Sequence, residues 1–548
     1  MWMRKTFLVV ALLALVSLGL FAFPGRAAAA TCTWDGTNPG NWSDTSHWTT
    51  CGGTYPSTTD TAIINSGTVT LDLSVTVLNL TLTSGTVTGA NDLTITGSLT
   101  WNSGTMSGNG TTTLAATGTL VSSASGTPTL DTRTFNNAGT VNWNSTSYLY
   151  LTNNAVFNNQ SGASYNIQTS STYAIYGSNG TFNNLSGATF TKSSSGDTGI
   201  YNLTAFNNTG TLTLTSAGVL TLSPSGTSTH TGPFNVNNAN ATLRFQGGIH
   251  NINTGADITG SGSVNFAGGS EYVHSTYNLS GDTLASGGAV TFPSGVTLTS
   301  LGSALTVSGG SIDLSSGLSL SVPSLTVSGG TLTGSDAITA TTTLNWSGGT
   351  MSGAGATNLA ASGTMITSAT GYITLDGRTF NNAGTVNWSS TGYLSLANNA
   401  VFNNLNGATF NTLSSGSYLI YGYAGSLVNA GTLNLPASGT LIANQFTQTS
   451  SGVINMSVAG TLAGTNFCSI TGTTSNLNGR LNVTVNGGYS PAFGDNLDIL
   501  LYTNHTGTFT QVSLPVLDPG LVWGVSYRTD RLRLQIMRGI FIPLITKP

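Results

Sequence analysis

The strongest constraint on this chain is a repeat of 22 to 25 residues. The decapeptide TFNNAGTVNW stands at residues 134–143 and again at 379–388. Its Phe-Asn-Asn core, or a degenerate form of it, returns one repeat length further along the chain in both halves. These repeats begin at Phe135, Phe157, Phe182 and Phe206, and then at Phe380, Phe402 and Leu427. A period of this length is typical of solenoid proteins, in which each repeat forms one coil.

A longer duplication is superimposed on this period. Residues 79–176 align without a gap on residues 324–421, at a constant offset of 245. The matched pairs include Trp101 and Trp346, Arg133 and Arg378, Tyr148 and Tyr393, and Tyr176 and Tyr421. A duplication that tolerates no insertion indicates that whole structural units were copied.

Each period consists of short β-like runs separated by Gly, Ser, Asn and Thr. The runs TVNW, YLYL and AVFNN alternate apolar and polar residues or are rich in β-branched and aromatic residues, which is typical of strands. Ten-residue stretches with helical spacing of apolar residues do not occur. The sequence therefore predicts an all-β chain: a single-stranded right-handed parallel β-helix (β-solenoid) with three short strands per coil, capped at both ends.

The composition agrees with stacked coils. Charged residues make up only 5% of the chain, and 39% are hydrophobic. In a parallel solenoid like residues stack on like, so rows of charge would repel, whereas Thr, Ser and Asn stack without penalty. A formal net charge of −4 provides no basic patch, so we expect no nucleic-acid partner.

The Asn-Asn pairs are expected at corners between strands, because Asn tolerates the left-handed conformation. Val428 replaces the first Asn of the degenerate repeat while Asn429 remains, which favours the second position as a hydrogen-bonded ladder. The predicted ladder comprises Asn137, Asn159, Asn184, Asn208, Asn382, Asn404 and Asn429. The alternative is a solvated turn that prefers Asn.

Five segments are predicted along the chain. They are a signal peptide at residues 1–30, a Trp-rich cap at 31–60, the solenoid at 61–465, a β-rich closing region at 466–537 and a short apolar tail at 538–548. Basic residues, an apolar run and four alanines predict cleavage after Ala30, the alternative being a membrane anchor. After signal removal we expect a secreted or cell-surface protein that does not span a membrane.

Cys32 and Cys51 flank the Trp-rich cap, and Cys468 lies far away. In an exported protein this spacing predicts a structural disulfide between Cys32 and Cys51, the alternative being three unpaired thiols.

Both ends of the chain carry motifs of a known type. The N-terminal motifs are Trp34 to Gly36, Asn41-Trp42 and Asp60 to Ile64; the C-terminal ones are Gly479, Leu481, Pro491, Gly494, Asp495, Gly507, Phe509, Leu521, Trp523, Val525 and Tyr527. In these segments the chain resembles secreted bacterial β-helix proteins of the adhesin and autotransporter-passenger type. The resemblance implies an exported surface or extracellular protein. Because only twelve residues follow Ile536, we expect no fused translocator barrel.

Candidate chemical groups are few. His250 and His274 are 24 residues apart, so we expect them to stack one coil apart with Glu271 nearby, as a polar cluster that binds a metal or transfers protons, or as a surface polar stack. Asp131 with Arg133, and equally Asp376 with Arg378, are expected to share a strand face and form ion pairs. Interior packing is the expected role of five aromatic residues, and stacking on sugar rings at the surface is the alternative. These residues are Trp101, Trp143, Tyr148, Trp346 and Tyr393.

No sequence motif for catalysis, metal binding or a cofactor is present, so we expect none of these. The favoured function is a non-enzymatic, rod-like structural or adhesin-like protein of the bacterial cell surface, with extracellular polysaccharide or other envelope proteins as partners. The alternatives are a β-helix protein that binds or degrades polysaccharide, and an ice-binding protein with ordered Thr rows.

Overall fold

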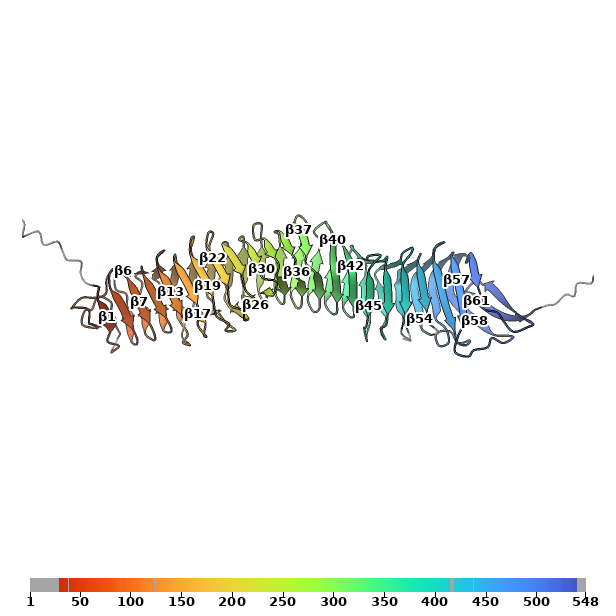
Figure 1. Cartoon of the computed structure of the whole chain (residues 1–548), viewed down its shortest axis with the longest axis horizontal. Helices are drawn as coiled ribbons and strands as arrows, with labels where there is room; N and C mark the ends of the chain where they lie inside the picture. The colour runs from red at the N-terminus through yellow and green to blue at the C-terminus, as the bar shows by residue number, and fades with distance from the viewer. Residues whose placement is uncertain (1–28, 38, 123–124, 414–417, 437, 540–548) are drawn as a thin grey trace, which may run out of the picture. The chain divides into compact units, whose positions relative to one another are not determined.

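In the residues that the computed structural model describes, every regular element is a β-strand. Those residues are 29–37, 39–122, 125–413, 418–436 and 438–539. Most of the predicted signal peptide and of the apolar tail therefore lies outside the described residues. The chain divides into unit 1, residues 1–183, and unit 2, residues 184–548. Each unit is a right-handed parallel β-solenoid with three strands per coil, which confirms the predicted fold class (Figure 1).

Unit 1 stacks its strands in three parallel columns. The first column contains β1 (Thr31–Trp34), β4 (Thr61–Ile64), β7 (Asn79–Leu82), β10 (Ser98–Trp101), β13 (Thr119–Ser122), β16 (Thr140–Trp143) and β19 (Ser164–Ile167). The second contains β2 (Gly40–Asn41), β5 (Thr68–Thr70), β8 (Thr86–Thr88), β11 (Thr105–Ser107), β14 (Thr129–Asp131), β17 (Leu149–Thr152) and β20 (Ile175–Ser178). The third contains β6 (Val75–Val77), β9 (Leu93–Ile95), β12 (Thr111–Leu114), β15 (Thr134–Asn137), β18 (Val156–Asn159) and β21 (Thr181–Asn184), whose last residue belongs to unit 2.

Unit 2 has the same plan. Its first column contains β22 (Thr189–Lys192), β25 (Thr211–Leu214), β28 (Phe234–Val236), β31 (Ile258–Gly260), β34 (Tyr277–Leu279) and β37 (Leu298–Leu301). The second contains β23 (Thr198–Tyr201), β26 (Gly218–Ser223), β29 (Ala241–Phe245), β32 (Ser263–Phe266), β35 (Thr283–Ala285), β38 (Ala304–Val307), β45 (Thr364–Thr367), β48 (Thr385–Trp388), β51 (Thr409–Thr412), β53 (Thr432–Leu435), β55 (Val453–Val458), β57 (Arg480–Val485) and β59 (Gln511–Ser513). The third contains β24 (Ala205–Asn208), β27 (Thr227–His230), β30 (Ile249–Ile252), β33 (Ser270–Val273), β36 (Ala289–Phe292), β39 (Ser311–Leu314), β41 (Thr331–Thr333), β43 (Thr350–Ser352), β46 (Ile373–Asp376) and β49 (Leu394–Ala397).

Several long strands of unit 2 pass through a corner and pair in two columns at once. They are β40 (Ser319–Val327), β42 (Ala337–Trp346), β52 (Ile420–Asn429), β54 (Thr440–Gln448), β56 (Ser469–Leu477) and β58 (Asn496–Gly507). Between β42 and β52 lie three short strands, β44 (Ala356–Leu359), β47 (Thr379–Asn382) and β50 (Val401–Asn404).

The interior of each unit is built from columns of identical or similar side chains. In unit 1 the Phe135 and Phe157 rings stack with centroids 4.9 Å apart, and Phe182 continues the column at the same distance. In unit 2 Phe380 and Phe402 stack at 5.0 Å. Stacked aromatic pairs contribute about 0.5–1.5 kcal/mol beyond the burial of their area. The repeated Phe is therefore explained by packing of each coil on the next.

The Asn-Asn pairs that follow these phenylalanines lie in strands, so their predicted place at corners is wrong. Asn136 and Asn137 are the last two residues of the extended strand β15. In the coil of β17 the left-handed asparagines are instead Asn153 and Asn154, with φ of 52° and 63°, directly after that strand. The corner is thus made by a different Asn-Asn pair of the same coil.

Parallel pairing extends past both ends of the predicted solenoid at residues 61–465. In unit 1, β1 pairs with β4 and β2 pairs with β5, so strands of the predicted cap already belong to the columns. In unit 2, β57 pairs with β59 and β56 with β58. Antiparallel strands add to these ends: β3 (Trp48–Thr49) pairs with β1, and β61 (Arg531–Arg538) pairs with β58 and β60 (Leu521–Tyr527). They satisfy backbone groups that an open edge would leave unpaired.

Candidate functional site

The most distinctive surface feature of unit 1 is a cluster of four tyrosines on β17, β20 and the turns before them. Tyr150 and Tyr176 are paired in register, and their rings stack at 6.2 Å with an interplanar angle of 24°. Tyr148 contacts Tyr173 at 6.0 Å and 83°, and contacts Tyr176 at 5.5 Å and 52°. The four side chains remain partly exposed to solvent, with Tyr173 at 37%. We call this set tyrosine cluster 1.

Unit 2 carries a corresponding set, tyrosine cluster 2, on β52 and in the turns directly before β46, β49 and β52. It consists of Tyr372, Tyr393, Tyr418, Tyr421 and Tyr423. Tyr393 contacts Tyr421 at 5.5 Å and 54°, and Tyr418 contacts Tyr421 at 5.3 Å and 79°. Tyr372 and Tyr423 are the most exposed members, at 64% and 61%.

Three tyrosines of each cluster are copies made by the block duplication. At the offset of 245, Tyr148 corresponds to Tyr393, Tyr173 to Tyr418, and Tyr176 to Tyr421. The ring geometry is copied too: the pair at 5.5 Å and 52° in cluster 1 is at 5.5 Å and 54° in cluster 2. The coils do not need these rings for their interior, because the rings point outward. Packing therefore does not explain why they are present in both copies.

Outward-facing hydroxyl groups line up with each cluster along its column of strands. In unit 1 the register runs coil by coil through Thr68, Thr86, Thr105 and Thr129 to Tyr150 and Tyr176. In unit 2 it runs through Ser311, Thr331, Thr350, Thr374 and Ser395 to Tyr421. We call these rows the hydroxyl columns. Threonines also face outward on the third column of unit 1, at Thr76, Thr94 and Thr113, so Thr rows are not confined to one face.

The turns that carry cluster 1 also form a shallow, uncharged hollow. Its volume is about 440 Å³, and its lining comprises Asn144, Thr146, Gln168, Thr169, Ser170 and Ser171. These residues directly precede Tyr148 and Tyr173 in the chain. All of the lining side chains are amides or hydroxyls, which both donate and accept hydrogen bonds.

Of the five residues considered as sugar platforms, only the tyrosines lie at the surface. Trp101, Trp143 and Trp346 are fully buried and belong to the interior columns. Tyr148 and Tyr393 belong to the two tyrosine clusters. Tyr173 and Tyr418 were not predicted as site residues, although they match each other within the block aligned at the offset of 245.

The predicted polar cluster of His250, Glu271 and His274 is only partly formed. His250 and Glu271 are paired in register on β30 and β33, and both are buried. His274 is exposed to solvent, so its predicted stacking on His250 is wrong. β30 pairs with β33 at an offset of 21 residues, which places Glu271 beside His250. On the preceding strand β27, which pairs with β30 at an offset of 22 residues, His230 lies diagonally to His250, and its Nε2 atom is 3.1 Å from Nδ1 of His250. Because this contact is diagonal and not in register, the repeat period alone did not point to His230.

Burial determines the protonation of this interior group. Desolvation lowers the pKa of His230 well below its usual value, with the neighbouring His250 adding to the effect, and lowers the pKa of His250 to about 4. Desolvation also raises the pKa of Glu271 to about 9. All three groups are therefore neutral at pH 7. Neither carboxyl oxygen of Glu271 has a hydrogen-bond partner among the described residues.

The predicted ladder asparagines are buried, and hydrogen bonds join them from coil to coil. In unit 1 the Asn137 amide donates to the Asn159 side-chain oxygen at 2.7 Å. In unit 2 equivalent bonds of 2.7 to 2.9 Å run from Asn184 to Asn208, from Asn382 to Asn404, from Asn404 to Asn429, and from Asn429 to Gln448. The first Asn of each pair forms a second, outer ladder that sequence analysis did not nominate, for example from Asn158 to Asn136 at 2.9 Å.

The predicted ion pairs of Arg133 with Asp131 and of Arg378 with Asp376 are wrong. Both arginines are fully buried and point inward. The residue between each pair, Thr132 or Gly377, has a positive φ of 63° or 64°, which breaks the alternation of a strand. Arg378 donates instead to Thr357 Oγ1 and to four carbonyl oxygens, and Arg133 makes the equivalent five bonds. Burial lowers the pKa of both arginines to about 10. This value is still well above 7, so both side chains remain charged at pH 7.

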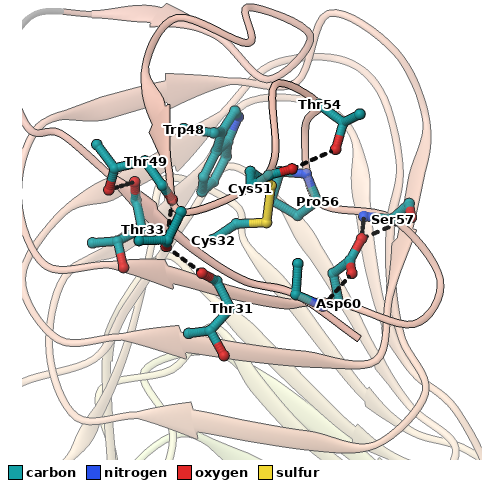
Figure 2. The surroundings of a disulfide bond; sticks show 12 residues. Thr31, Cys32, Thr33, Trp48, Thr49, Cys51, Thr54, Pro56, Ser57 and Asp60 are labelled. Carbon is teal, nitrogen blue, oxygen red and sulfur yellow. Dashed lines mark hydrogen bonds between the residues drawn. A yellow bond between two sulfur atoms is a disulfide. The ribbon is translucent and has the colours of Figure 1, made fainter. Parts of the chain in front are cut away.

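The predicted disulfide is confirmed: Cys32 on β1 is bonded to Cys51, and both are buried beneath Trp48 (Figure 2). Beside it, the Asp60 carboxylate accepts bonds from the backbone N–H groups of Ser57 at 2.9 Å and Ala30 at 2.8 Å. Cys468 is buried and unpaired. A structural disulfide favours an oxidising, extracytoplasmic setting.

Within the ranges that the structure describes, we find no helix of the length and hydrophobicity needed to cross a bilayer, and no group of three or more His, Cys, Asp or Glu side chains arranged to hold a metal ion. No protein-family model matches the chain, and no curated protein matches it in sequence.

Proposed function

We propose that this chain is a non-enzymatic, adhesin-like protein of the bacterial cell surface, whose stacked coils form a rod-like scaffold. The tyrosine clusters are the parts of this scaffold that make contact with a partner. A solenoid suits the role because each coil contacts only its neighbours, so coils can be added without redesigning the core. The predicted signal peptide and the disulfide in the N-terminal coils support export of the chain.

The observation that carries the proposal is the copying of exposed tyrosines together with the scaffold. Tyr418 and Tyr421 are 42% and 36% exposed, yet they match Tyr173 and Tyr176 in residue type and ring geometry. Exposed aromatic groups that the core does not need are a mark of a contact surface. Two copies on one chain would also strengthen attachment by multivalency.

The proposal is tested in cells that produce the full chain. Brief protease treatment of intact cells should remove the protein, and deletion of its gene should lower retention of the cells on their growth surface under flow. Cells producing a chain in which Tyr148, Tyr173, Tyr393 and Tyr418 are all replaced by Ser should behave like the deletion strain. A chain found only inside the cell, or unchanged retention after deletion, would overturn the proposal.

The proposal that the protein has no catalytic activity on polysaccharides is tested separately. Purified protein incubated with a panel of soluble polysaccharides should release no new reducing ends and no unsaturated products. Release of either would establish a polysaccharide hydrolase or lyase and refute a scaffold without catalysis.

A further inference from the structure

We infer that the two tyrosine clusters, with their hydroxyl columns, are binding sites for an extended, uncharged polysaccharide chain. This inference rests on the proposed function and gives the ligand class for the adhesive surface. The ligand would lie along the stack of coils, crossing one coil after another.

The aromatic rings supply the main contact. The faces of pyranose rings present C–H groups, which pack on aromatic rings, and the tyrosine hydroxyl leaves a polar edge for the sugar hydroxyls. In cluster 2 the rings of Tyr393, Tyr418 and Tyr421 are inclined at 54° to 79° to one another. Faces with different orientations suit a ligand whose successive rings are also turned relative to one another. Tyrosine loses little conformational freedom on binding, because it has only two side-chain torsions.

The hydroxyl columns extend each cluster in the direction of the stack. Thr350, Thr374 and Ser395 lie one coil apart in register before Tyr421, and each is half-buried. Adjacent parallel strands are about 4.8 Å apart, which is close to the length of one sugar residue in an extended chain. Each coil can therefore offer one hydroxyl group to one sugar unit. A polymer gains from this repetition, whereas a single sugar does not.

The charge of the surroundings selects an uncharged ligand. Arg133 and Arg378, the arginines nearest in sequence to the clusters, are buried with all their donors occupied. Lys192, the one lysine among the described residues, is also buried. Asp131 on β14 and Asp376 on β46 end strands of the hydroxyl columns; their carboxylates accept bonds from Asn153 and Asn398 and would repel an anionic chain. The polar hollow of unit 1 likewise has only amide and hydroxyl groups in its lining.

A second copy of the chain fits these clusters less well. A stable protein interface buries about 800 Å² on each partner. An aromatic side chain has roughly 150–250 Å² to bury, and the exposed members of cluster 2 are only 36% to 64% exposed. Four such rings supply a few hundred Å², which is enough to hold part of a sugar chain but too little for a stable dimer.

The test uses the full mature protein in native gels that contain one soluble polysaccharide each. The probes are mixed-linkage β-glucan and amylose as neutral chains, and polygalacturonate as an anionic chain. We expect at least one neutral glucan to retard the protein and polygalacturonate not to do so. Replacing Tyr393, Tyr418 and Tyr421 by Ser, together with Tyr148, Tyr173 and Tyr176, should weaken the binding at least about tenfold. Phe at the same six positions should keep most of the binding.

Tyr272→Ser is the matched control, because Tyr272 is 41% exposed on β33 outside both clusters; it should bind like the wild type. Should the multiple Ser variant fail to fold, chemical iodination of the wild type decides the matter. Bound glucan should protect Tyr393 and Tyr421 from iodination, but not Tyr272. The inference is overturned by absence of retardation in both neutral glucans, by preference for polygalacturonate, or by equal protection of Tyr272. If cells still adhere through the protein in any of these cases, the adhesive function stands and only the ligand class is wrong.

Discussion

Arg378 and Glu271 are both ionisable side chains buried inside unit 2, and they differ in how many hydrogen-bond partners the coils provide. Around Arg378, five acceptors from two preceding coils meet the guanidinium at 2.9 to 3.1 Å, and the group keeps its charge. Around Glu271 no partner is found for either oxygen among the described residues, and burial raises the pKa of this carboxyl to about 9. The arginine is held as a cation, whereas the glutamate is held as a neutral acid.

The difference follows from what a parallel coil can offer. Corners between strands expose backbone carbonyl groups that the ladders leave free, and a planar guanidinium with five donors can reach several of them at once. A carboxylate needs donors, but the backbone N–H groups beside Glu271 are already used in parallel pairing with His250 and Val290 on the neighbouring strands. The solenoid interior therefore accepts a cation at a corner more readily than an anion within a strand.

Removing the arginine should have the largest effect. Arg378→Met leaves four carbonyl oxygens and the Thr357 hydroxyl without their partner in the interior, so we expect the free energy of unfolding to fall by about 3–5 kcal/mol. Urea denaturation measures the loss. Because solenoids unfold in segments, hydrogen exchange of β43, β44 and β47 should show that the loss is local.

The control for this variant is Arg480→Met, since Arg480 is exposed at the start of β57 and should change stability by less than about 0.5 kcal/mol. Equal stability of Arg378→Met and the wild type would contradict the view that satisfied hydrogen bonds, rather than packing volume, hold this corner.

The Asn ladders allow a finer version of the same comparison, because the inner and outer ladders are adjacent in sequence. Asn404 accepts from Asn382 and donates to Asn429 at 2.8 Å and to the Thr432 carbonyl at 3.0 Å, all in the interior. Asn404→Ala should cost about 2–3 kcal/mol, since it leaves buried amides unpaired on both sides. Asn403→Ala removes only a half-buried bond to Asn381 and should cost less than about 1 kcal/mol. Thermal and urea midpoints of the two variants make the comparison, and equal losses would contradict it.

Repetition made the architecture predictable from the sequence. Phe135 and Phe157 could be assigned to one column, and Asn137 and Asn159 to another, because residues one period apart must stack in a parallel solenoid. This periodic pattern is a strong indication of a solenoid because every coil repeats it. The low content of charged residues is also expected for stacked coils.

Features that occur once or depend on one torsion were not predictable in this way. The inward direction of Arg378 depends on the positive φ of Gly377, which the two-residue spacing from Asp376 does not reveal. The in-register partner of His250 on the next coil depended on the length of that coil, 21 residues instead of 24, so that Glu271 and not His274 lies beside it. The exposure of the tyrosine clusters could not be predicted either. Aromatic residues occur on both the inward and the outward faces of these strands, and the sequence pattern does not distinguish the two.

The pH dependence at Glu271, whose slope is at most about 1.4 kcal/mol per pH unit, tests the neutral side of the comparison. The folded pKa, about 9, lies above the usual value for glutamate in an unfolded chain, about 4.3. Below pH 4 both states hold the proton and the group makes no difference. As the pH rises above about 4.3, the unfolded chain releases the proton while the folded chain keeps it, so stability falls by up to about 1.4 kcal/mol per pH unit until about pH 9.

His250 limits the window in which this can be seen. Its folded pKa, about 4, is below the usual 6.5, so the unfolded chain alone takes up a proton between these values and stability falls with decreasing pH there. Glu271 should thus act without opposition from His250 only above pH 6.5. Urea denaturation at pH 6.5, 7.5 and 8.5 should show falling stability for the wild type and a flatter profile for Glu271→Gln, which keeps the shape but has no proton to lose. If the wild type and Glu271→Gln lost stability equally with rising pH, hydrogen-bond donors would reach the Glu271 carboxyl in solution. Glu271 and Arg378 would then differ only in the number of their hydrogen bonds.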